Sequence, residues 1–182
     1  MKIYIMIADG FEETEALVPW DILKRAGADV KLVSVSKQSK ATGSHGLVID
    51  TDTAIDSVQN NTPDLIVLPG GMPGMLNLKN SVILKDMLVK CEKSGKLVAA
   101  ICASPAVLGA HGLLKGRSAV CFPGFESQLE GARVSEEFVC RDGNIITAKG
   151  MGVSFVFAFA LVSALYGDAK AEELKKGAQY IK

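Results

Sequence analysis

The chain has 182 residues, of which 48% are apolar, and its 20 basic and 20 acidic side chains leave no formal net charge. This length and composition predict a single domain over residues 1–182 and leave little room for a second one. No block of Lys or Arg is present to bind a phosphate backbone, so dedicated nucleic-acid binding is not expected.

Short apolar runs rich in β-branched residues alternate with longer segments of helical period along the chain. The alternation is typical of βαβ units around a mainly parallel sheet, and it predicts an α/β sandwich. The expected strands are residues 2–8, 29–34, 46–50, 64–68, 97–101, 118–121 and 145–148.

Glycines mark the ends of the first two expected helices. The first should end near Gly27, because basic residues in its last turn suit the helix dipole and glycine can take the left-handed cap position. Its start is harder to place, since Pro19 fits a first turn or a kink better than a helix interior. A second helix is expected over residues 81–93 and should end at Gly95 for the same reason.

The C-terminal third combines a turn and a long apolar run. Asp142-Gly143 between apolar segments predicts a β-hairpin. The apolar run 153–165 covers about two-thirds of the ~20 residues that a membrane-spanning helix needs. We therefore expect a buried helix after Gly150 and Gly152, and no membrane partner.

The N-terminal residues and the cysteines predict a cytoplasmic protein. Residues 1–8 are apolar only briefly and lack the flanks of a signal peptide. The four cysteines are widely spaced and form no C-x-x-C pair, which indicates reduced thiols. His45 and His111 have no metal-like spacing with a cysteine, so neither a metal nor another cofactor is expected.

The strongest chemical signal is Cys102, which follows the apolar run 97–101 and precedes the helix-initiating Pro105. Small residues, Ala100 and Ser104, flank it with the spacing of a nucleophile elbow, a strained turn between a strand and a helix. Active sites of α/β proteins lie at such strand ends, and the following helix amides should lower the thiol pKa from about 8.5 toward roughly 3.5–7.5. The alternative is a buried structural cysteine.

A second signal is Pro69-Gly70-Gly71, directly after another expected strand. Two glycines can present bare backbone amides at the same edge of the sheet, where Gly70 and Gly71 would form an oxyanion-binding nest. The same dipeptides are also common in ordinary turns. The proximity to Cys102 that the topology implies favours the nest.

A third signal is a group of four acids after the first strand, Asp9, Glu12, Glu13 and Glu15. Asp9 and Glu12 have the spacing of a capping box, and acids suit a helix start. One of the other carboxylates could point back to the strand ends, share a proton with the thiolate and serve as general acid or base.

Three further residues are weaker candidates. His111 should point away from Cys102 on the following helix, and His45 lies in a polar loop where solvation is expected. Cys121 ends a short expected strand and could approach the site, although burial is the commoner outcome for such a residue.

With these motifs in this order, the chain resembles the ThiJ/PfpI superfamily (the DJ-one/PfpI family), in the branch of the Parkinson-associated protein deglycase and its bacterial relatives. The resemblance runs nearly end to end. It implies a flavodoxin-like three-layer sandwich of the class I glutamine amidotransferase type, and a homodimer. The residues that carry it are 9–15, 68–71, 99–103, 147–152 and 154–155.

The resemblance also assigns roles. Cys102 corresponds to the nucleophile or redox thiol, and Glu15 to the acid that hydrogen-bonds its sulfur. Gly71 and Ala103 correspond to donors of backbone amides to an oxyanion or an oxidised sulfur. Phe122 stands where many members have a histidine, and Ala103 where protease-like members have one. A Cys–His dyad and peptidase activity are therefore not expected.

Two functions follow from these residues. As an enzyme, the protein would convert reactive 2-oxoaldehydes, either as a glutathione-independent, glyoxalase III-like lyase or as a deglycase, a hydrolase of methylglyoxal adducts on proteins or nucleotides. Cys102 would attack the carbonyl and Glu15 would move protons. The alternative is a redox-sensing stress protein or holdase chaperone that depends on reversible oxidation of Cys102.

Overall fold

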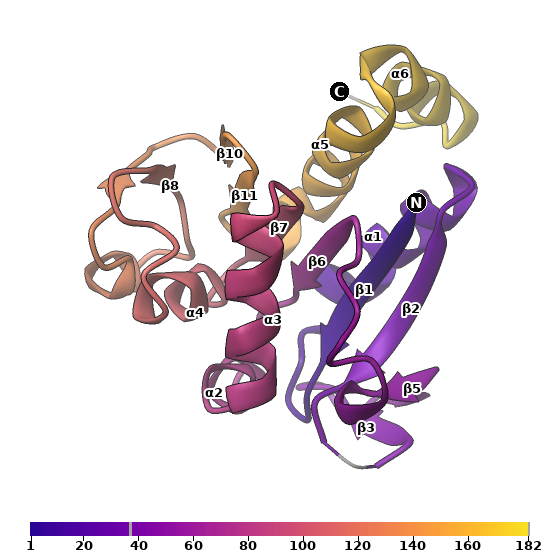
Figure 1. The fold of residues 1–182 in the computed structure, drawn as a ribbon. Helices are drawn as coiled ribbons and strands as arrows, with labels where there is room; N and C mark the ends of the chain where they lie inside the picture. Colours follow the sequence, from indigo (N-terminus) through magenta and orange to yellow (C-terminus); the bar gives the residue numbers. More distant parts are fainter. Residues whose placement is uncertain (37, 182) are drawn as a thin grey trace.

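The computed structural model describes residues 1–36 and 38–181, with a seven-stranded sheet at its centre (Figure 1). The strand order is β10-β11-β7-β6-β1-β2-β5, and every neighbouring pair is parallel except β10 and β11. The strands are β1 (Lys2–Ile7), β2 (Asp29–Ser34), β5 (Thr53–Ala54), β6 (Leu65–Leu68), β7 (Leu97–Ile101), β10 (Val139–Asp142) and β11 (Ile145–Ala148).

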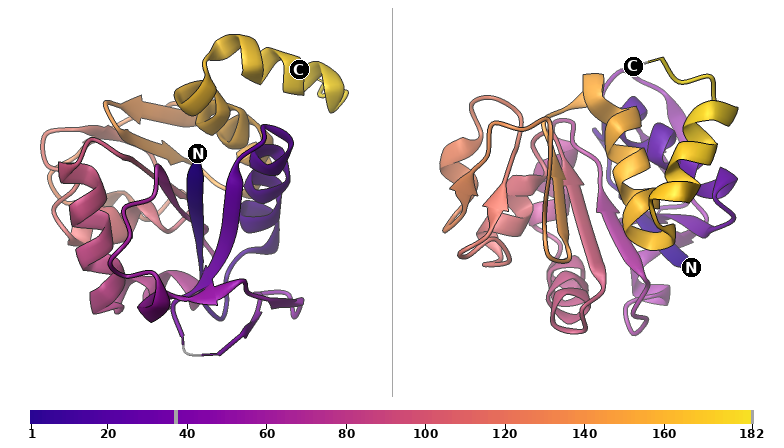
Figure 2. Two further views of the ribbon diagram at one scale, coloured as in Figure 1. Left: turned by 45° about the vertical axis from the view of Figure 1, so that its right-hand side comes forward. Right: turned by 90° about the horizontal axis from the view of Figure 1, so that it is seen from above.

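Helices cover both faces of this sheet (Figures 1 and 2). Buried side chains of α2, α3 and α4 form the core on one face, and those of α1, α5 and α6 form the core on the other. The three-layer α/β sandwich predicted from the sequence is therefore confirmed. The helices are α1 (Glu13–Arg25), α2 (Gly74–Lys79), α3 (Val82–Lys93), α4 (Pro105–Ala110), α5 (Ser154–Tyr166) and α6 (Asp168–Gly177).

Strand β1 shows why the apolar runs identified the sheet. Ile3, Ile5 and Ile7 enter one core while Tyr4 and Met6 enter the other, and all five are at most 1% exposed. Burying each of them contributes about 1.5–3 kcal/mol. Because strands covered on both faces need apolar residues at every position, they appear as continuous apolar runs.

The predicted helix ends are confirmed. Gly27 follows α1 with a φ of 85°, and Gly95 follows α3 with a φ of 68°, a region that glycine enters without steric cost. Ser81 caps α3, since its hydroxyl accepts a hydrogen bond from the Leu84 backbone N–H at 3.3 Å.

Pro19 corrects one expectation, because it lies in the interior of α1. A proline there removes the hydrogen bond to the carbonyl of Glu15, four residues earlier. The ring is buried, and this packing offsets part of the loss. The sequence rule weighs the lost bond but not the tertiary contact.

Two expected strands do not belong to the main sheet. Residues 46–50 contribute only β4 (Val48–Asp50), which pairs with β3 (Lys40–Thr42) in a separate hairpin. Residues 118–121 contribute only β8 (Ser118–Ala119), which pairs with β9 (Arg133–Val134). The elements that the sequence missed, among them β5, α2 and α6, are mostly too short to show a clear period.

The expected buried helix is present as α5, but only one of its sides is buried. Phe157 and Leu161 are fully buried, whereas Phe155 and Val156 are 45% and 40% exposed. Within residues 1–36 and 38–181, none of the helices combines the length and the apolar content needed to cross a bilayer.

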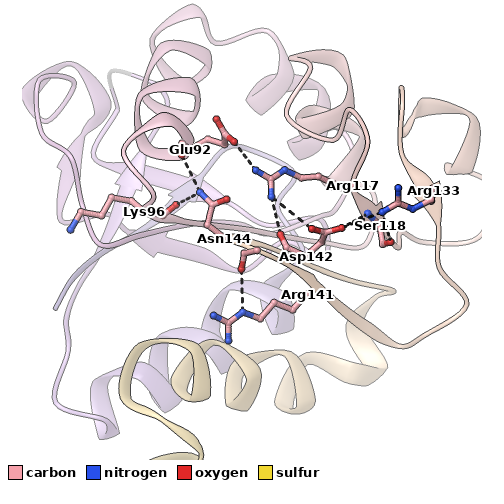
Figure 3. A network of polar contacts seen from close by, with 9 residues as sticks. Glu92, Lys96, Arg117, Ser118, Arg133, Arg141, Asp142 and Asn144 are labelled. Atoms are coloured by element: carbon pink, nitrogen blue, oxygen red, sulfur yellow. Dashed lines mark hydrogen bonds and ion pairs between the residues drawn. The ribbon is translucent and has the colours of Figure 1, made fainter.

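A polar network joins the amino-terminal edges of β7 and β11 to α3 and β8 (Figure 3). Arg117 donates to Glu92 Oε1 at 2.7 Å and to the Asp142 carbonyl at 3.0 Å. The Asp142 carboxylate accepts from the Ser118 backbone N–H at 2.8 Å. Asn144 donates to the carbonyl of Glu92 at 3.1 Å. The network holds the predicted β10–β11 hairpin, which is confirmed, against the helical layer.

We predict that Asp142→Ala lowers the free energy of unfolding by about 1–3 kcal/mol, because the Ser118 N–H loses its acceptor in a partly buried position. Urea unfolding followed by circular dichroism measures this. The control is Asp50→Ala, whose carboxylate is exposed and 4.0 Å from Lys40, a surface pair worth at most about 1 kcal/mol. Equal losses in the two variants would show that the network adds nothing.

Candidate active site

Cys102 lies at the carboxyl end of β7 in a strained turn. Its φ of 64° is in the left-handed region, which costs a non-glycine residue about 1–3 kcal/mol. Backbone hydrogen bonds hold it there: its N–H donates to the Ala148 carbonyl at 2.9 Å, and its carbonyl accepts from the Phe122 N–H at 2.8 Å. The strained strand-to-helix turn predicted at Cys102 is therefore present.

The loop after β6 approaches the elbow so closely that neither Gly70 nor Gly71 has room for a side chain. A Cβ added to Gly70 would lie 2.6 Å from Cys102 Cβ and 2.6 Å from Glu15 Oε2. Gly71 has a φ of 90°, and a Cβ there would lie 2.4 Å from the Glu12 backbone nitrogen. The topology thus brings the Gly70-Gly71 loop, Glu15 and Cys102 to one edge of the sheet.

Glu15 is fully buried, and its two oxygens differ. Oε2 accepts a hydrogen bond from the Gly70 backbone N–H at 2.8 Å. Oε1 has no partner of normal hydrogen-bond geometry among the described residues. Burial, together with the charge of Glu12, raises the pKa of Glu15 to about 7, although hydrogen bonds from Gly70 and the Cys102 thiol act in the opposite direction. A buried oxygen without a donor is stabilised by taking up a proton.

Cys102 departs from the sequence-based expectation of a lowered pKa. Burial, and then the charge of Glu15 and its contact with the thiol, raise the pKa of Cys102 to about 12, while the N–H groups of Ala103 and Gly71 act to lower it. The expectation failed because it considered only the backbone amides, whereas burial and the nearby Glu15 outweigh them.

The two raised pKa values mean that Cys102 and Glu15 together retain one proton around neutral pH. The thiol has the higher pKa, so this proton lies mostly on sulfur; the thiolate forms when the proton moves to Glu15, because an ionised Glu15 repels a negative sulfur. The Ala103 and Gly71 amides then act on the sulfur. This arrangement can supply a nucleophile and an adjacent carboxylic acid at the same time.

Asp9 and Glu12 do not form the expected capping box. Asp9 Oδ1 accepts instead from the Thr42 backbone N–H at 2.9 Å, which ties it to β3. Glu12 is itself the N-cap of α1, and its Oε2 accepts from the Glu15 N–H at 2.7 Å. The cap therefore fixes the backbone of the residue whose side chain faces Cys102.

Glu13 forms an ion pair with His45, with 2.8 Å between Oε2 and Nδ1. Although burial acts to raise it, hydrogen bonds from the His45 side chain and backbone lower the pKa of Glu13 to about 2. With Glu12, these residues are the one group among the described residues whose ligand atoms lie close enough for a metal ion. The ion pair already accounts for their proximity.

The remaining candidates lie outside the pair. His111 is the C-cap of α4, and the charged groups that act on it are Lys85 and Lys79 rather than Cys102 or Glu15. Cys121 is buried, so Cys102 is the only one of the four free cysteines that is partly exposed. Phe122, at the position where many relatives were expected to have a histidine, donates its backbone N–H to the Cys102 carbonyl.

Ser104 has a contact that the sequence pattern did not indicate. The pattern explained only its small size, whereas its buried hydroxyl donates to the Pro69 carbonyl at 2.6 Å.

A three-layer α/β sandwich with a cysteine at a strained elbow beside a buried acid defines the class of this protein. Residues 1–164 match the DJ-1/PfpI family, and the chain belongs to that family. The family resemblance noted in the sequence is thereby confirmed.

Relatives support this assignment along the whole chain. Protein DJ-1 homolog B of Arabidopsis thaliana is 41% identical over 175 residues, which cover 95% of this chain but 40% of that relative. Glutathione-independent glyoxalase DJR-1.2 of Caenorhabditis elegans is 36% identical over 166 residues, which cover 91% of this chain and 88% of the relative. Oxidized Toxoplasma gondii DJ-1 superposes with a TM-score of 0.96 at 38% identity, over 100% of this chain and 99% of the other.

We predict that Glu15 makes stability fall as pH rises. Its pKa is higher in the folded state, about 7, than the ordinary 4.5, so its contribution is complete below pH 4.5 and is lost as pH rises through 7. The upper bound of this loss is about 3 kcal/mol. This decline should be absent from Glu15→Gln, so the unfolding free energy of wild type minus that of the variant should fall between pH 4.5 and 7. A difference that does not vary with pH would contradict the raised pKa.

Proposed function

We propose that this protein converts small 2-oxoaldehydes to 2-hydroxy acids without glutathione. The observation that carries the proposal is the Cys102–Glu15 pair, a thiol and a buried acid that retain one proton between them. The Caenorhabditis elegans relative is named a glutathione-independent glyoxalase, which supports the same reaction class.

The chemistry uses the shared proton in both directions. The proton moves from the Cys102 sulfur to Glu15, the thiolate adds to the aldehyde carbon, and Glu15 returns the proton to the resulting oxyanion to give a hemithioacetal. The Gly71 and Ala103 amides stabilise that oxyanion as it forms.

Glu15, now a carboxylate, removes the proton from the hemithioacetal carbon, which gives an enediolate. Glu15 returns this proton to the neighbouring carbon, and the hemithioacetal hydroxyl proton moves to the former ketone oxygen. The ketone thereby becomes a hydroxyl group and the sulfur is left in a thioester. Water then cleaves the thioester, releases the 2-hydroxy acid and restores the thiol. With neither histidine against Cys102, Glu15 performs each of these transfers.

A deglycase is the finer alternative: Cys102 would replace the amine or thiol on the former aldehyde carbon of a methylglyoxal adduct, that group would leave with a proton from Glu15, and the later steps would be the same. A redox role is the second candidate, favoured by the partial exposure of Cys102 among four free cysteines. A sulfenate or sulfinate at Cys102 would accept hydrogen bonds from the Ala103 and Gly71 amides and from protonated Glu15.

We predict that Cys102→Ser abolishes methylglyoxal turnover in the absence of added thiol, and that Glu15→Gln lowers kcat/KM by roughly 100-fold or more, the scale expected for a general acid or base. Lactate formation measures both. Asp21→Asn, an acid-to-amide change on the exposed side of the same helix, is the control and should match wild type. Wild-type turnover in Glu15→Gln would refute the mechanism. No turnover in the wild type would leave the redox role as the candidate.

We also propose a homodimer formed through the face that carries α5. Phe155 and Val156 are exposed on α5, and Leu47 and Val48 are exposed on the β3–β4 hairpin. The hairpin packs through Ile49 on the same core as α5. Exposed apolar side chains on this face, in a chain with positive mean hydropathy, suit a second copy.

We predict a dimer at micromolar concentration in sedimentation velocity, and a shift to monomer in Val156→Asp. The control is Val82→Asp, since Val82 is 70% exposed on α3, across the sheet from α5. That variant should remain dimeric. A monomeric wild type, or dissociation by both substitutions, would contradict an interface on the α5 face.

A further inference from the structure

One peptide group, between Pro69 and Gly70, connects a serine hydroxyl to the acid of the site. Its carbonyl accepts a hydrogen bond from Ser104 Oγ at 2.6 Å. Its N–H donates to Glu15 Oε2 at 2.8 Å. Ser104 and Glu15 are both fully buried, so neither bond competes with water.

The hydroxyl of Ser104 is not explained by its local position. Ser104 is the N-cap of α4, where a serine side chain ordinarily accepts a hydrogen bond from a helix N–H, but it makes no such bond. It donates instead to Pro69, 35 positions away in the sequence. The side chain is thus committed to the loop that contacts Glu15.

We propose that Ser104 is a positioning residue that controls how Cys102 and Glu15 share their proton, acting through the Pro69–Gly70 peptide. A donor on the carbonyl of a peptide polarises the group and strengthens donation by its N–H. The bond from Ser104 therefore strengthens the one that Gly70 gives to ionised Glu15. It also holds the loop that presents the Gly71 amide.

This role predicts a specific change in the reactivity of Cys102. Below the midpoint both groups are protonated. The fraction of Cys102 present as thiolate then depends on the acidity of the thiol beside a neutral acid, which Ser104 affects little. Above the midpoint Cys102 and Glu15 hold one proton, and a weaker hydrogen bond from Gly70 leaves that proton on Glu15, and the sulfur as thiolate, in a larger fraction of molecules. Loss of the Ser104 hydroxyl should then raise both the midpoint and the plateau of the pH profile of thiol reactivity.

Other charged groups around the pair stay constant in this comparison. Glu12 faces Glu15 from the start of α1, and its charge raises the Glu15 pKa. Glu13 and His45 are paired with each other. Lys149, after β11, lies over the ring of Phe138. Substitution of Ser104 changes none of these contacts.

The test is the rate of Cys102 alkylation by iodoacetamide between roughly pH 5 and 9, followed by peptide mass spectrometry. For Ser104→Ala we expect the midpoint to rise by about half a pH unit and the plateau by about three-fold, with unchanged rates well below the midpoint. The control is Ser34→Ala, which removes another buried hydroxyl bonded to a backbone carbonyl, at 3.1 Å from Ser36 O. It should follow the wild-type profile. A Ser104→Ala profile identical to wild type, or one with a lower plateau, would overturn the proposal.

A conservative variant and a measurement on the wild type complete the test. Ser104→Thr keeps a hydroxyl donor and should restore the wild-type midpoint; a shift as large as that of Ser104→Ala would count against the hydrogen bond. In the wild-type protein, the Gly70 amide proton and the Pro69 carbonyl carbon should titrate in NMR with the midpoint of the alkylation profile. A Pro69 signal that does not move across this midpoint would overturn the proposal even if Ser104→Ala fails to fold.

The effect of Ser104 on aldehyde turnover can be tested only if the proposed function is correct. Its effect on the alkylation of Cys102 does not depend on that function. Loss of the Ser104 bond releases the loop that orients Glu15, so fewer encounters place the carboxylate in line with the carbon-bound proton, although the carboxylate itself binds a proton more strongly. We expect kcat in Ser104→Ala to fall while KM changes little. A wild type that lacks turnover but shows the Ser104-dependent profile would refute the reaction and retain the positioning role.

Discussion

The proton shared by Cys102 and Glu15 is the interaction on which the rest of the site depends. Without Glu15, burial would still raise the pKa of the Cys102 thiol, although the Ala103 and Gly71 N–H groups would act to lower it. A buried acid without the thiol would stay neutral at low pH. When the two groups are adjacent, the protonation state of each depends on the other, so formation of the thiolate nucleophile is coupled to protonation of Glu15. The Gly70 amide, the Glu12 charge and the burial of Glu15 set the balance. Substrate chemistry at the sulfur is therefore also proton chemistry at Glu15.

The fold makes this pair possible by placing two strained or crowded segments at one sheet edge. Cys102 is held at positive φ by Ala148 and Phe122, and Gly70 lies where no side chain fits. The parallel strands β6 and β7 are neighbours, so the loops at their carboxyl ends must meet. The cost of the strained turn is met by the two apolar cores, which bury both faces of the strands.

The sequence predicted the features that depend on local pattern and failed where tertiary contacts decide. Continuous apolar runs located the central strands, and small residues around Cys102 identified the elbow. Pro19 was misjudged because packing compensates its missing bond. The predicted direction of the Cys102 pKa was wrong because a local rule about helix amides omits burial of the thiol and also omits Glu15, which lies in a helix 87 positions earlier in the chain. The role of Ser104 required knowing that its hydroxyl turns away from its own helix.

Phe122 explains why so much depends on one carboxyl group. A histidine at that position would offer a second base near neutral pH and divide the proton transfers between two residues. Phenylalanine cannot hold a proton, and its backbone already contacts the Cys102 carbonyl. Aldehyde addition and sulfur oxidation then differ in one respect. After aldehyde addition and release of the product, Cys102 and Glu15 return to their starting protonation state. After oxidation, the negative charge of a sulfinate at Cys102 would keep Glu15 protonated. The same pair supports a cycle in the first case and a lasting change of state in the second.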